Sequence, residues 1–173
     1  VGALHPRKNI GNLFMAFDRF KQMHSSDFKL VIVGEKKWWT SAMEHAYNNM
    51  QHKEDVIFTG RLYNKDLHQV IGASAALTYV SIFEGFGIPI LEAFYCDVPV
   101  ITSNVTSMPE VSGDAALLVD PYSIDSIAQA MTRIAVDETC SEELILKGRE
   151  RKKDFSWQKT ASLLWDSIEK ALE

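Results

Sequence analysis

The residues with the clearest potential for chemistry lie between positions 81 and 92, in the run SIFEGFGIPILE. Gly85 and Gly87 allow the backbone to turn tightly and to approach a ligand closely. Pro89 suits the first turn of a helix, where its missing N–H costs nothing. Because the free N–H groups of such a turn point into the preceding loop and attract anions, we predict a loop that binds a phosphate-bearing ligand.

Two carboxylates, eight residues apart, flank this turn. Glu92 is the only charged residue of a helix expected at 88–96, and that helix is so apolar that we expect it to be buried. A buried carboxylate needs a partner, either an internal donor or basic residue, or a pair of ligand hydroxyls, and the sequence favours neither. Glu84 lies in the loop, either as a surface or loop-capping carboxylate or as a second acceptor for the ligand.

Two cations, Arg7 and Lys8, follow His5 and Pro6 and precede another expected helix. Beside a helix N-terminus they can clamp a diphosphate, the guanidinium as a fork and the ammonium as a point charge. Taken alone, the two side chains are more simply interpreted as solvated cations at the protein surface. The basic run at 149–153 (RERKK) also has two interpretations, a solvated helix end, which is favoured, or a contact with a phosphate-rich surface.

Strands alternate with helices along the chain, and this alternation must position these residues. Short apolar or β-branched runs predict buried strands at 28–33, 55–59, 75–80, 98–102 and 116–119. Apolar residues spaced three and four apart predict helices at 9–23, 38–51, 64–73, 88–96, 123–137, 141–153 and 156–172. Asn64 and Ser123 are expected N-caps. The order predicts an α/β fold with a Rossmann-like parallel sheet flanked by helices.

In open parallel sheets, ligands bind outside the carboxyl ends of the strands. Three expected strand ends carry suggestive residues, at 2–8, 34–37 and 81–87. The chain begins Val1-Gly2 without a methionine, and this start reads like the end of a strand, so we expect it to begin inside a longer protein.

Composition limits the class of protein. The chain has 173 residues, a formal net charge of −5 and 46% hydrophobic residues, which predicts one globular domain and excludes a disordered chain. The acidic balance argues against bulk nucleic-acid binding. Two distant cysteines argue against a disulfide scaffold or a structural zinc site and favour a reducing compartment. The sequence has no P-loop, complete dinucleotide fingerprint, nucleophile elbow or HExxH motif.

Residues 84–93 (EGFGIPILEA) resemble the E-x7-E signature of the retaining GT-B glycosyltransferases of the large group 1 family, glycosyltransferase family 4. Further segments resemble the same family in order, at 1–9, 30–34, 57–61, 97–103, 108–121 and 155–172. The resemblance covers nearly the whole chain. It implies that residues 1–173 form the nucleotide-sugar-binding C-terminal domain of a GT-B fold, whose N-terminal acceptor domain is absent here.

The resemblance also implies roles for the glycine turn and its two carboxylates. Glu92 would accept hydrogen bonds from the ribose hydroxyls, and Glu84 would hold hydroxyls of the donor sugar near the reacting carbon. Backbone N–H groups around the turn would bind donor hydroxyls or phosphate, at Gly85, Phe86, Gly87 and Ile88.

The same resemblance assigns the diphosphate to Lys8 and Arg7, which would neutralise it as it departs without a metal or other cofactor. The loop around Tyr63 would contact the base through its backbone. Ala3 departs from the pattern, because many family members carry a phosphate-binding arginine there. Either Arg7 compensates, or phosphate binding is weaker or differently shaped.

The implied function is transfer of a sugar from a UDP-, GDP- or ADP-sugar to a glycan, lipid or small acceptor, as in polysaccharide biosynthesis. The domain is expected to be inactive alone, and its partners are the nucleotide sugar, the N-terminal domain and the acceptor, with no nucleic acid. A cytoplasmic location follows, peripheral to the inner face of the membrane. The alternatives are a GT-B epimerase or phosphorylase relative and a non-catalytic nucleotide-binding module.

The last helix, at 156–172, carries more apolar side chains than a terminal helix needs, including Leu164, Trp165 and Ile168. In two-domain relatives this helix crosses onto the other domain. A fragment would then expose an apolar patch and self-associate, whereas packing of the helix on its own sheet is the equal alternative.

Overall fold

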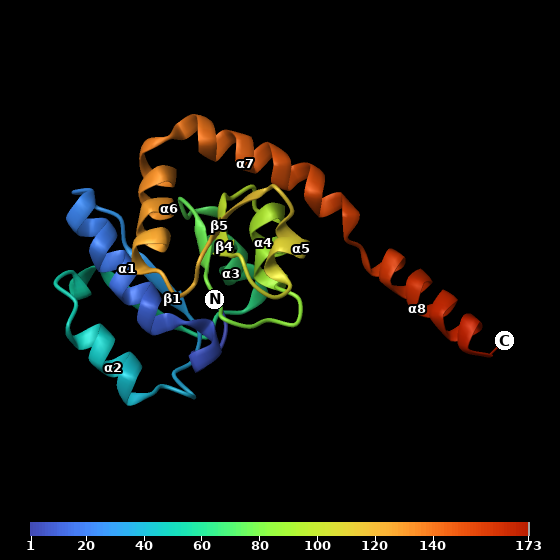
Figure 1. Ribbon diagram of the computed structural model, residues 1–173, viewed down its shortest axis with the longest axis horizontal. Helices are drawn as coiled ribbons and strands as arrows, with labels where there is room; N and C mark the ends of the chain where they lie inside the picture. Colours follow the sequence, from blue (N-terminus) through green and yellow to red (C-terminus); the bar gives the residue numbers. More distant parts are fainter. Residues whose placement is uncertain (173) are drawn as a thin grey trace.

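The computed structural model describes residues 1–172, and its strands are all parallel (Figure 1). Within these residues the strands pair as two sheets, β1-β2 and β3-β4-β5. The strands are β1 (Leu30–Val33), β2 (Val56–Gly60), β3 (Leu77–Tyr79), β4 (Val100–Ser103) and β5 (Ala116–Val119). The expected α/β class and parallel pairing are confirmed, but the expected single sheet is divided between β1 and β3.

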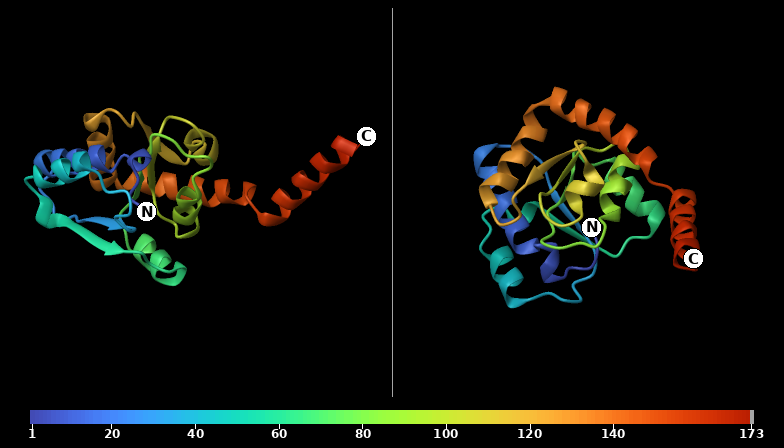
Figure 2. Two further views of the ribbon diagram at one scale, coloured as in Figure 1. Left: turned by 90° about the horizontal axis from the view of Figure 1, so that it is seen from below. Right: turned by 45° about the vertical axis from the view of Figure 1, so that its right-hand side comes forward.

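Helices alternate with the strands and, apart from α8, pack around the two sheets (Figures 1 and 2). They are α1 (Ile10–Met23), α2 (Ser41–Asn48), α3 (Asn64–Gly72), α4 (Ile88–Tyr95), α5 (Met108–Ser112), α6 (Ile124–Val136), α7 (Glu138–Arg151) and α8 (Trp157–Leu172). Short 3-10 turns lie at Pro6–Lys8, Lys53–Asp55 and Lys152–Asp154. Helix α5 is not among the helices predicted from the sequence, because its five residues carry too short an apolar pattern to detect.

Helix ends explain most differences from the expected boundaries. Ser123 caps α6 as expected, with its Oγ accepting from the Ser126 N–H at 3.2 Å. Asp137 caps α7 in the same way, accepting from the Cys140 N–H at 2.9 Å, so α7 begins three residues earlier than expected. Asn64 is not an N-cap, because it is the first residue of α3 and the cap position belongs to Tyr63.

Two apolar clusters form the core. In the first, α1 lies between α2 and α6, and its fully buried Phe14 meets the rings of Trp39, Tyr47 and Phe58 at 5.5–6.2 Å. In the second, Ile90 and Phe94 of α4 pack on β3 and β4. Burial of each such side chain stabilises the fold by about 1.5–3 kcal/mol.

The basic run of α7 fixes this helix against α4 and α5. Arg149 pairs with Asp97 at 3.0 Å, Lys152 donates to the Phe94 carbonyl at 3.0 Å, and Arg151 donates to the Val111 carbonyl at 3.2 Å. Arg151 and Lys152 therefore hold protein groups, whereas the side chains of Arg149 and Lys153 are 50% and 66% exposed, so the interpretation of the run as a solvated helix end describes part of it.

Helix α8 extends away from the body of the domain beyond α7 (Figures 1 and 2). Trp157, Leu164, Trp165 and Leu172 are all exposed, so the packing of this helix on its own sheet is not observed. Self-association through this face stays a prediction. Among the described helices, none combines the length and the apolar character that a membrane span requires.

The contact between α7 and α4 generates a test. A Cβ added at Gly148 of α7 would lie 2.7 Å from Cδ1 of the buried Phe94 ring, so α7 must shift. We expect Gly148→Ala to lower the free energy of unfolding by about 1–3 kcal/mol, the usual cost of overpacking. Urea unfolding measures this change in the free energy of unfolding.

Gly11→Ala is the matched control for Gly148→Ala. Its Cβ would lie 3.8 Å from the Ala46 Cβ, an ordinary contact, and alanine favours a helix by up to about 1 kcal/mol. Equal stabilities of the two variants would contradict the close packing of α7 on α4.

Candidate functional site

The loop after β3 and the loop before α1 meet at one edge of the three-stranded sheet. Asn9 joins them, because its buried Nδ2 donates to the Val80 carbonyl at 3.1 Å and to the Pro121 carbonyl at 2.6 Å. The Ile82 N–H also donates to the Arg7 carbonyl at 2.8 Å. The two regions with the clearest chemical potential, 75 residues apart in sequence, therefore lie side by side.

Glu84 is the centre of this junction. Its side chain is only 9% exposed, Lys8 Nζ lies 2.7 Å from Oε1, and the Arg7 guanidinium forms an ion pair with Oε2. Lys8 is 11% exposed and Arg7 43%. The interpretation of Glu84 as a surface carboxylate is therefore wrong, and so is the interpretation of Lys8 as solvated, whereas Arg7 reaches solvent from one side.

The charges of this cluster follow from its burial and its pairing. Burial raises the pKa of the Glu84 carboxyl, but hydrogen bonds, chiefly from Lys8 and Arg7, outweigh it and lower that pKa to about 2. Burial lowers the pKa of Lys8, and the neighbouring Glu84 opposes that effect. Burial and Glu84 raise the pKa of Tyr79, whose hydroxyl accepts from Lys8 at 2.6 Å. One carboxylate thus faces two cations and a neutral phenol, which leaves the cluster one positive charge for an anion.

The glycine turn lies beside the cluster. Gly87, with φ of 111°, ends the turn and α4 begins at Ile88. Within residues 1–172 the N–H groups of Gly85, Phe86, Gly87 and Ile88 donate to no other group. Free N–H groups at a helix N-terminus can bind an anion, and the anion site at this turn stays a prediction.

Two hydroxyl residues that the sequence analysis did not single out hold this turn in place. The Glu84 N–H donates to Thr106 Oγ1 at 3.3 Å, and Ser107 Oγ lies 3.0 Å from the Glu84 carbonyl and 2.8 Å from the Phe86 carbonyl. The hydroxyl-rich run TSNVTS at 102–107 is the only sequence signal for them. At the other side of the turn, the Phe86 ring meets the Phe155 ring edge-on at 5.8 Å.

Glu92 is less buried than the sequence predicts. Helix α4 buries only one face, at Ile90, Ala93 and Phe94, so Glu92 is half-buried rather than buried. In the part of the chain that the structure describes, its carboxylate forms no ion pair and no hydrogen bond. The internal partner that full burial would require is therefore not observed, and the carboxylate remains open to a ligand.

The remaining predicted positions lie around the cluster. The backbones of Gly2 and Gly34 touch, since a Cβ on Gly34 would lie 1.9 Å from the Gly2 carbonyl oxygen, so the first two strand ends meet as well. Ala3 follows this contact. Tyr63 is 77% exposed at the position directly before α3. No three metal-binding side chains converge within residues 1–172.

The chain is similar in sequence and in fold to known proteins. Residues 1–151 match the family model of glycosyl transferases group 1. The O-antigen chain mannosyltransferase B of Escherichia coli is 34% identical over 158 residues, which are 91% of this chain and 42% of that protein. The O-antigen chain mannosyltransferase RfbU of Salmonella typhimurium is 32% identical over 134 residues, 78% of this chain and 37% of that protein. The chain thus spans less than half the length of these curated relatives.

A solved structure of sucrose-phosphate synthase from Thermosynechococcus elongatus superimposes with a TM-score of 0.82 at 25% identity, over 99% of this chain and 44% of that one. The C-terminal domain of a glycosyl transferase group 1 family protein from Francisella tularensis shares the fold, with a TM-score of 0.77 at 21% identity, over 89% of this chain and 82% of that one. Because the family match spans 151 of the 173 residues, the chain belongs to the glycosyl transferases group 1 family.

Proposed function

We propose that this chain is the donor-binding domain of a retaining glycosyltransferase that takes a sugar from a nucleoside diphosphate. The observation that carries the proposal is the cluster of Glu84, Arg7 and Lys8 beside four unpaired N–H groups of the glycine turn. Cations and aligned N–H groups together form a site for a diphosphate.

The diphosphate is the part of the donor that this site is best suited to bind. Negative charge develops on the diphosphate as the glycosidic bond breaks, and fixed cations stabilise that charge without a metal. Arg7 approaches the diphosphate from the solvent side and Lys8 from the buried side. The turn N–H groups, from Gly85 to Ile88, complete the cradle.

The carboxylates hold the two sugars of the donor. Glu92 accepts from the ribose hydroxyls, which its unpaired, half-exposed position supports. Glu84 has both oxygens on cations. A diphosphate that draws Arg7 toward itself frees Oε2 of Glu84 to accept from a hydroxyl of the donor sugar. Tyr63 lies on an exposed loop that contacts the base through its backbone.

The acceptor site and the transfer itself belong to a longer protein. The relatives are more than twice as long, which supports an N-terminal domain that binds the acceptor. Their names make a mannosyl donor and a polysaccharide acceptor the first pair to test. The proposed location is the cytoplasm, with peripheral contact at the inner face of the membrane. The isolated chain binds nucleoside diphosphates and transfers nothing.

Lys8→Ala tests the diphosphate site. Loss of a charge-assisted hydrogen bond costs about 1.5–3 kcal/mol, so we expect the variant to bind GDP, UDP or ADP about 10-fold to 100-fold more weakly and the matching nucleoside almost unchanged. Calorimetry with EDTA present measures both. Lys147→Ala, on α7 away from the site, is the matched control.

Two results would count against this assignment of Lys8. Equal losses of affinity for the diphosphate and the nucleoside would remove Lys8 from the phosphate site. An absence of heat for all three nucleoside diphosphates with the unchanged chain would overturn the donor site itself.

Glu92→Gln tests the ribose contact. Because the carboxylate has no internal partner, we expect the melting temperature to stay within about 1 °C of the original, a surface-substitution effect. We expect the affinity for both nucleoside and nucleotide to fall about 10-fold, since a neutral amide is a weaker acceptor. Glu143→Gln on α7 is the control. Unchanged affinity with a lower melting temperature would assign Glu92 a structural role.

The ion pairs of Glu84 predict a pH dependence. Its folded-state pKa of about 2 lies below the ordinary glutamate value of about 4.3, so ionised Glu84 stabilises the fold above about pH 4.3. That stabilisation is lost as the pH falls toward 2. We expect the free energy of unfolding of Glu84→Gln to fall less steeply than that of the unchanged chain, measured by urea unfolding between pH 5 and pH 3.

Asp55→Asn is the control for the pH dependence. The carboxyl of Asp55 also has a pKa of about 2, because Lys21 and Lys29 donate to it far from the glycine turn. The two substitutions are therefore expected to flatten the pH profile independently, and their effects to add in the double variant. Identical profiles for Glu84→Gln and the unchanged chain would refute the ion pairs.

A further inference from the structure

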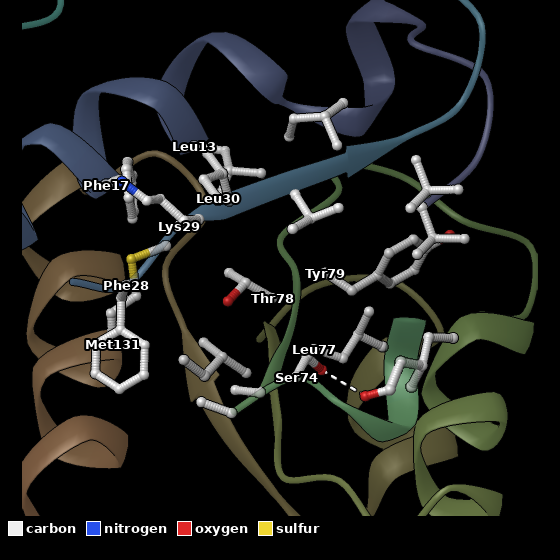
Figure 3. A pocket seen from close by; sticks show the side chains of 18 of the residues that line it. Leu13, Phe17, Phe28, Lys29, Leu30, Ser74, Leu77, Thr78, Tyr79 and Met131 are labelled. Carbon is white, nitrogen blue, oxygen red and sulfur yellow. Dashed lines mark hydrogen bonds between the residues drawn. The ribbon is translucent and has the colours of Figure 1, made fainter. Parts of the chain in front are cut away.

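The glycine turn lies beyond the apolar interior of the domain. Strand β3, which leads toward it, borders a mostly apolar cavity of about 760 Å³ with Leu77, Thr78 and Tyr79 (Figure 3). In the described part of the chain, the wall of this cavity extends along the segment as far as Ser81, and residues 82–88 do not line it. Contacts of another kind therefore hold the turn, whose N–H groups need a fixed direction to bind an anion.

The first of these contacts comes from α5. Ser107 directly precedes this five-residue helix, and its Oγ lies 3.0 Å from the Glu84 carbonyl and 2.8 Å from the Phe86 carbonyl. A helix this short has little stability of its own, and the carbonyl groups of its last turn lack helical partners. The position of Ser107 therefore depends on what holds the other end of α5.

Arg151, the last residue of α7, holds that other end. Its Nε donates to the Val111 carbonyl at 3.2 Å, and its Nη2 donates to the Glu110 carbonyl. Asp154 pairs with Nη1 at 2.7 Å and fixes the guanidinium from the opposite side. Gly113 leaves room for this contact, because a Cβ there would lie 3.3 Å from Nε. A planar guanidinium can bind two carbonyls at once in a fixed geometry, which a lysine ammonium cannot reproduce.

The same guanidinium reaches the turn by a second route. Arg151 Cζ lies 4.9 Å from the centroid of the Phe155 ring, and the Phe155 ring meets the Phe86 ring at an interplanar angle of 88°. Cation–π and edge-to-face contacts both depend on the direction of approach. Arg151 thus supports Phe86 twice, at its ring through Phe155 and at its carbonyl through α5 and Ser107.

We propose that Arg151 and Phe155 are positioning residues of the donor site. They hold the N–H groups of residues 85–88 in the direction that a diphosphate requires, and they act through the turn rather than on the ligand. Arg151 belongs to the basic run at 149–153, so its charge serves a phosphate site without touching the phosphate. That the ligand is a diphosphate rests on the proposed function, whereas the support of the turn rests on the contacts alone.

Backbone motion of the turn tests the support without any ligand. Phe155→Leu removes the ring, Phe155→Tyr keeps it, and Arg151→Lys keeps the charge but removes the planar fork. Nitrogen relaxation measured by NMR gives the order parameters of residues 85–88. We expect them to fall from about 0.85, the value of rigid backbone, toward about 0.6 in Phe155→Leu and Arg151→Lys. Phe155→Tyr should keep the original values.

Trp157→Ala is the matched control, because Trp157 is an aromatic residue two positions beyond Phe155 and is 83% exposed. It should leave the order parameters of the turn unchanged. The order parameters of residues 90–94 in α4 should stay constant in every variant. Unchanged values at 85–88 in both Phe155→Leu and Arg151→Lys would overturn the proposal, and so would a loss of order that extends equally through α4.

Binding tests the consequence for the donor site. The probes are GDP, UDP and ADP, each compared with its nucleoside by calorimetry. For Phe155→Leu and Arg151→Lys we expect about 3-fold to 10-fold weaker binding of the diphosphate, the scale of one aromatic or cation–π contact. The affinity for the nucleoside should change less, because the turn N–H groups meet only the diphosphate. Equal losses for both ligands would contradict the positioning role.

Ser107→Ala tests the route through α5. Its Oγ contacts two carbonyls of the turn, so we expect this variant to weaken diphosphate binding as well. Because Arg151 acts partly through the same contact, adding Arg151→Lys should weaken binding by less than the product of the two single effects. The full product would overturn the route from Arg151 through α5 to Ser107.

Failure of the proposed function would give a different result. If the unchanged chain binds none of GDP, UDP and ADP, the donor site is overturned, and the relaxation data still decide whether Arg151 and Phe155 hold the turn. If the unchanged chain binds a diphosphate, and the turn becomes mobile in the variants without loss of affinity, the donor site stands and the positioning role is overturned.

Discussion

The carboxylate of Glu84 is the one group on which the arrangement of the site depends. A buried carboxylate is stable only when it is paired, and here Lys8 and Arg7 supply the partners from the first residues of the chain. The ion pairs therefore determine where the loop after β3 lies against the loop before α1. They also hold the buried Lys8 at a fixed position before any ligand arrives, which reduces the reorganisation that anion binding would otherwise require.

Uncharged contacts support these ion pairs from two sides. Asn9 connects the loop before α1 to the chain after β3 and after β5, and the hydroxyls of Thr106 and Ser107 hold the backbone of the glycine turn. The loops that follow three different strands are thus linked through backbone groups. This explains how a short, glycine-containing turn keeps its N–H groups aligned while they have no acceptor of their own.

The sequence predicts where the helices and strands of this domain lie better than it predicts the burial and the contacts of their side chains. Periodicity locates α1, α6 and all five strands, and the order of elements predicts the parallel pairing. It favours a buried Glu92 and a surface or loop Glu84, but the structure half-buries Glu92 and buries Glu84. Burial in α4 depends on which face meets a neighbour, and burial of Glu84 depends on Arg7 and Lys8, 77 and 76 positions away. Among the described residues no strand pairs with both β1 and β3, and no local sequence pattern predicts that division. The roles of Glu92, Tyr63 and the turn N–H groups stay predictions.

Helix α8 and the glycine turn are mechanically connected through one aromatic contact. The Phe86 ring rests on Phe155, which directly precedes the junction where α8 leaves the body of the domain. A helix of 16 residues is about 24 Å long, so a rotation of about 10° at its base displaces its far end by about 4 Å. The base of α8 therefore lies beside the glycine turn, and any rotation there grows along the length of the helix into a much larger displacement of its tip.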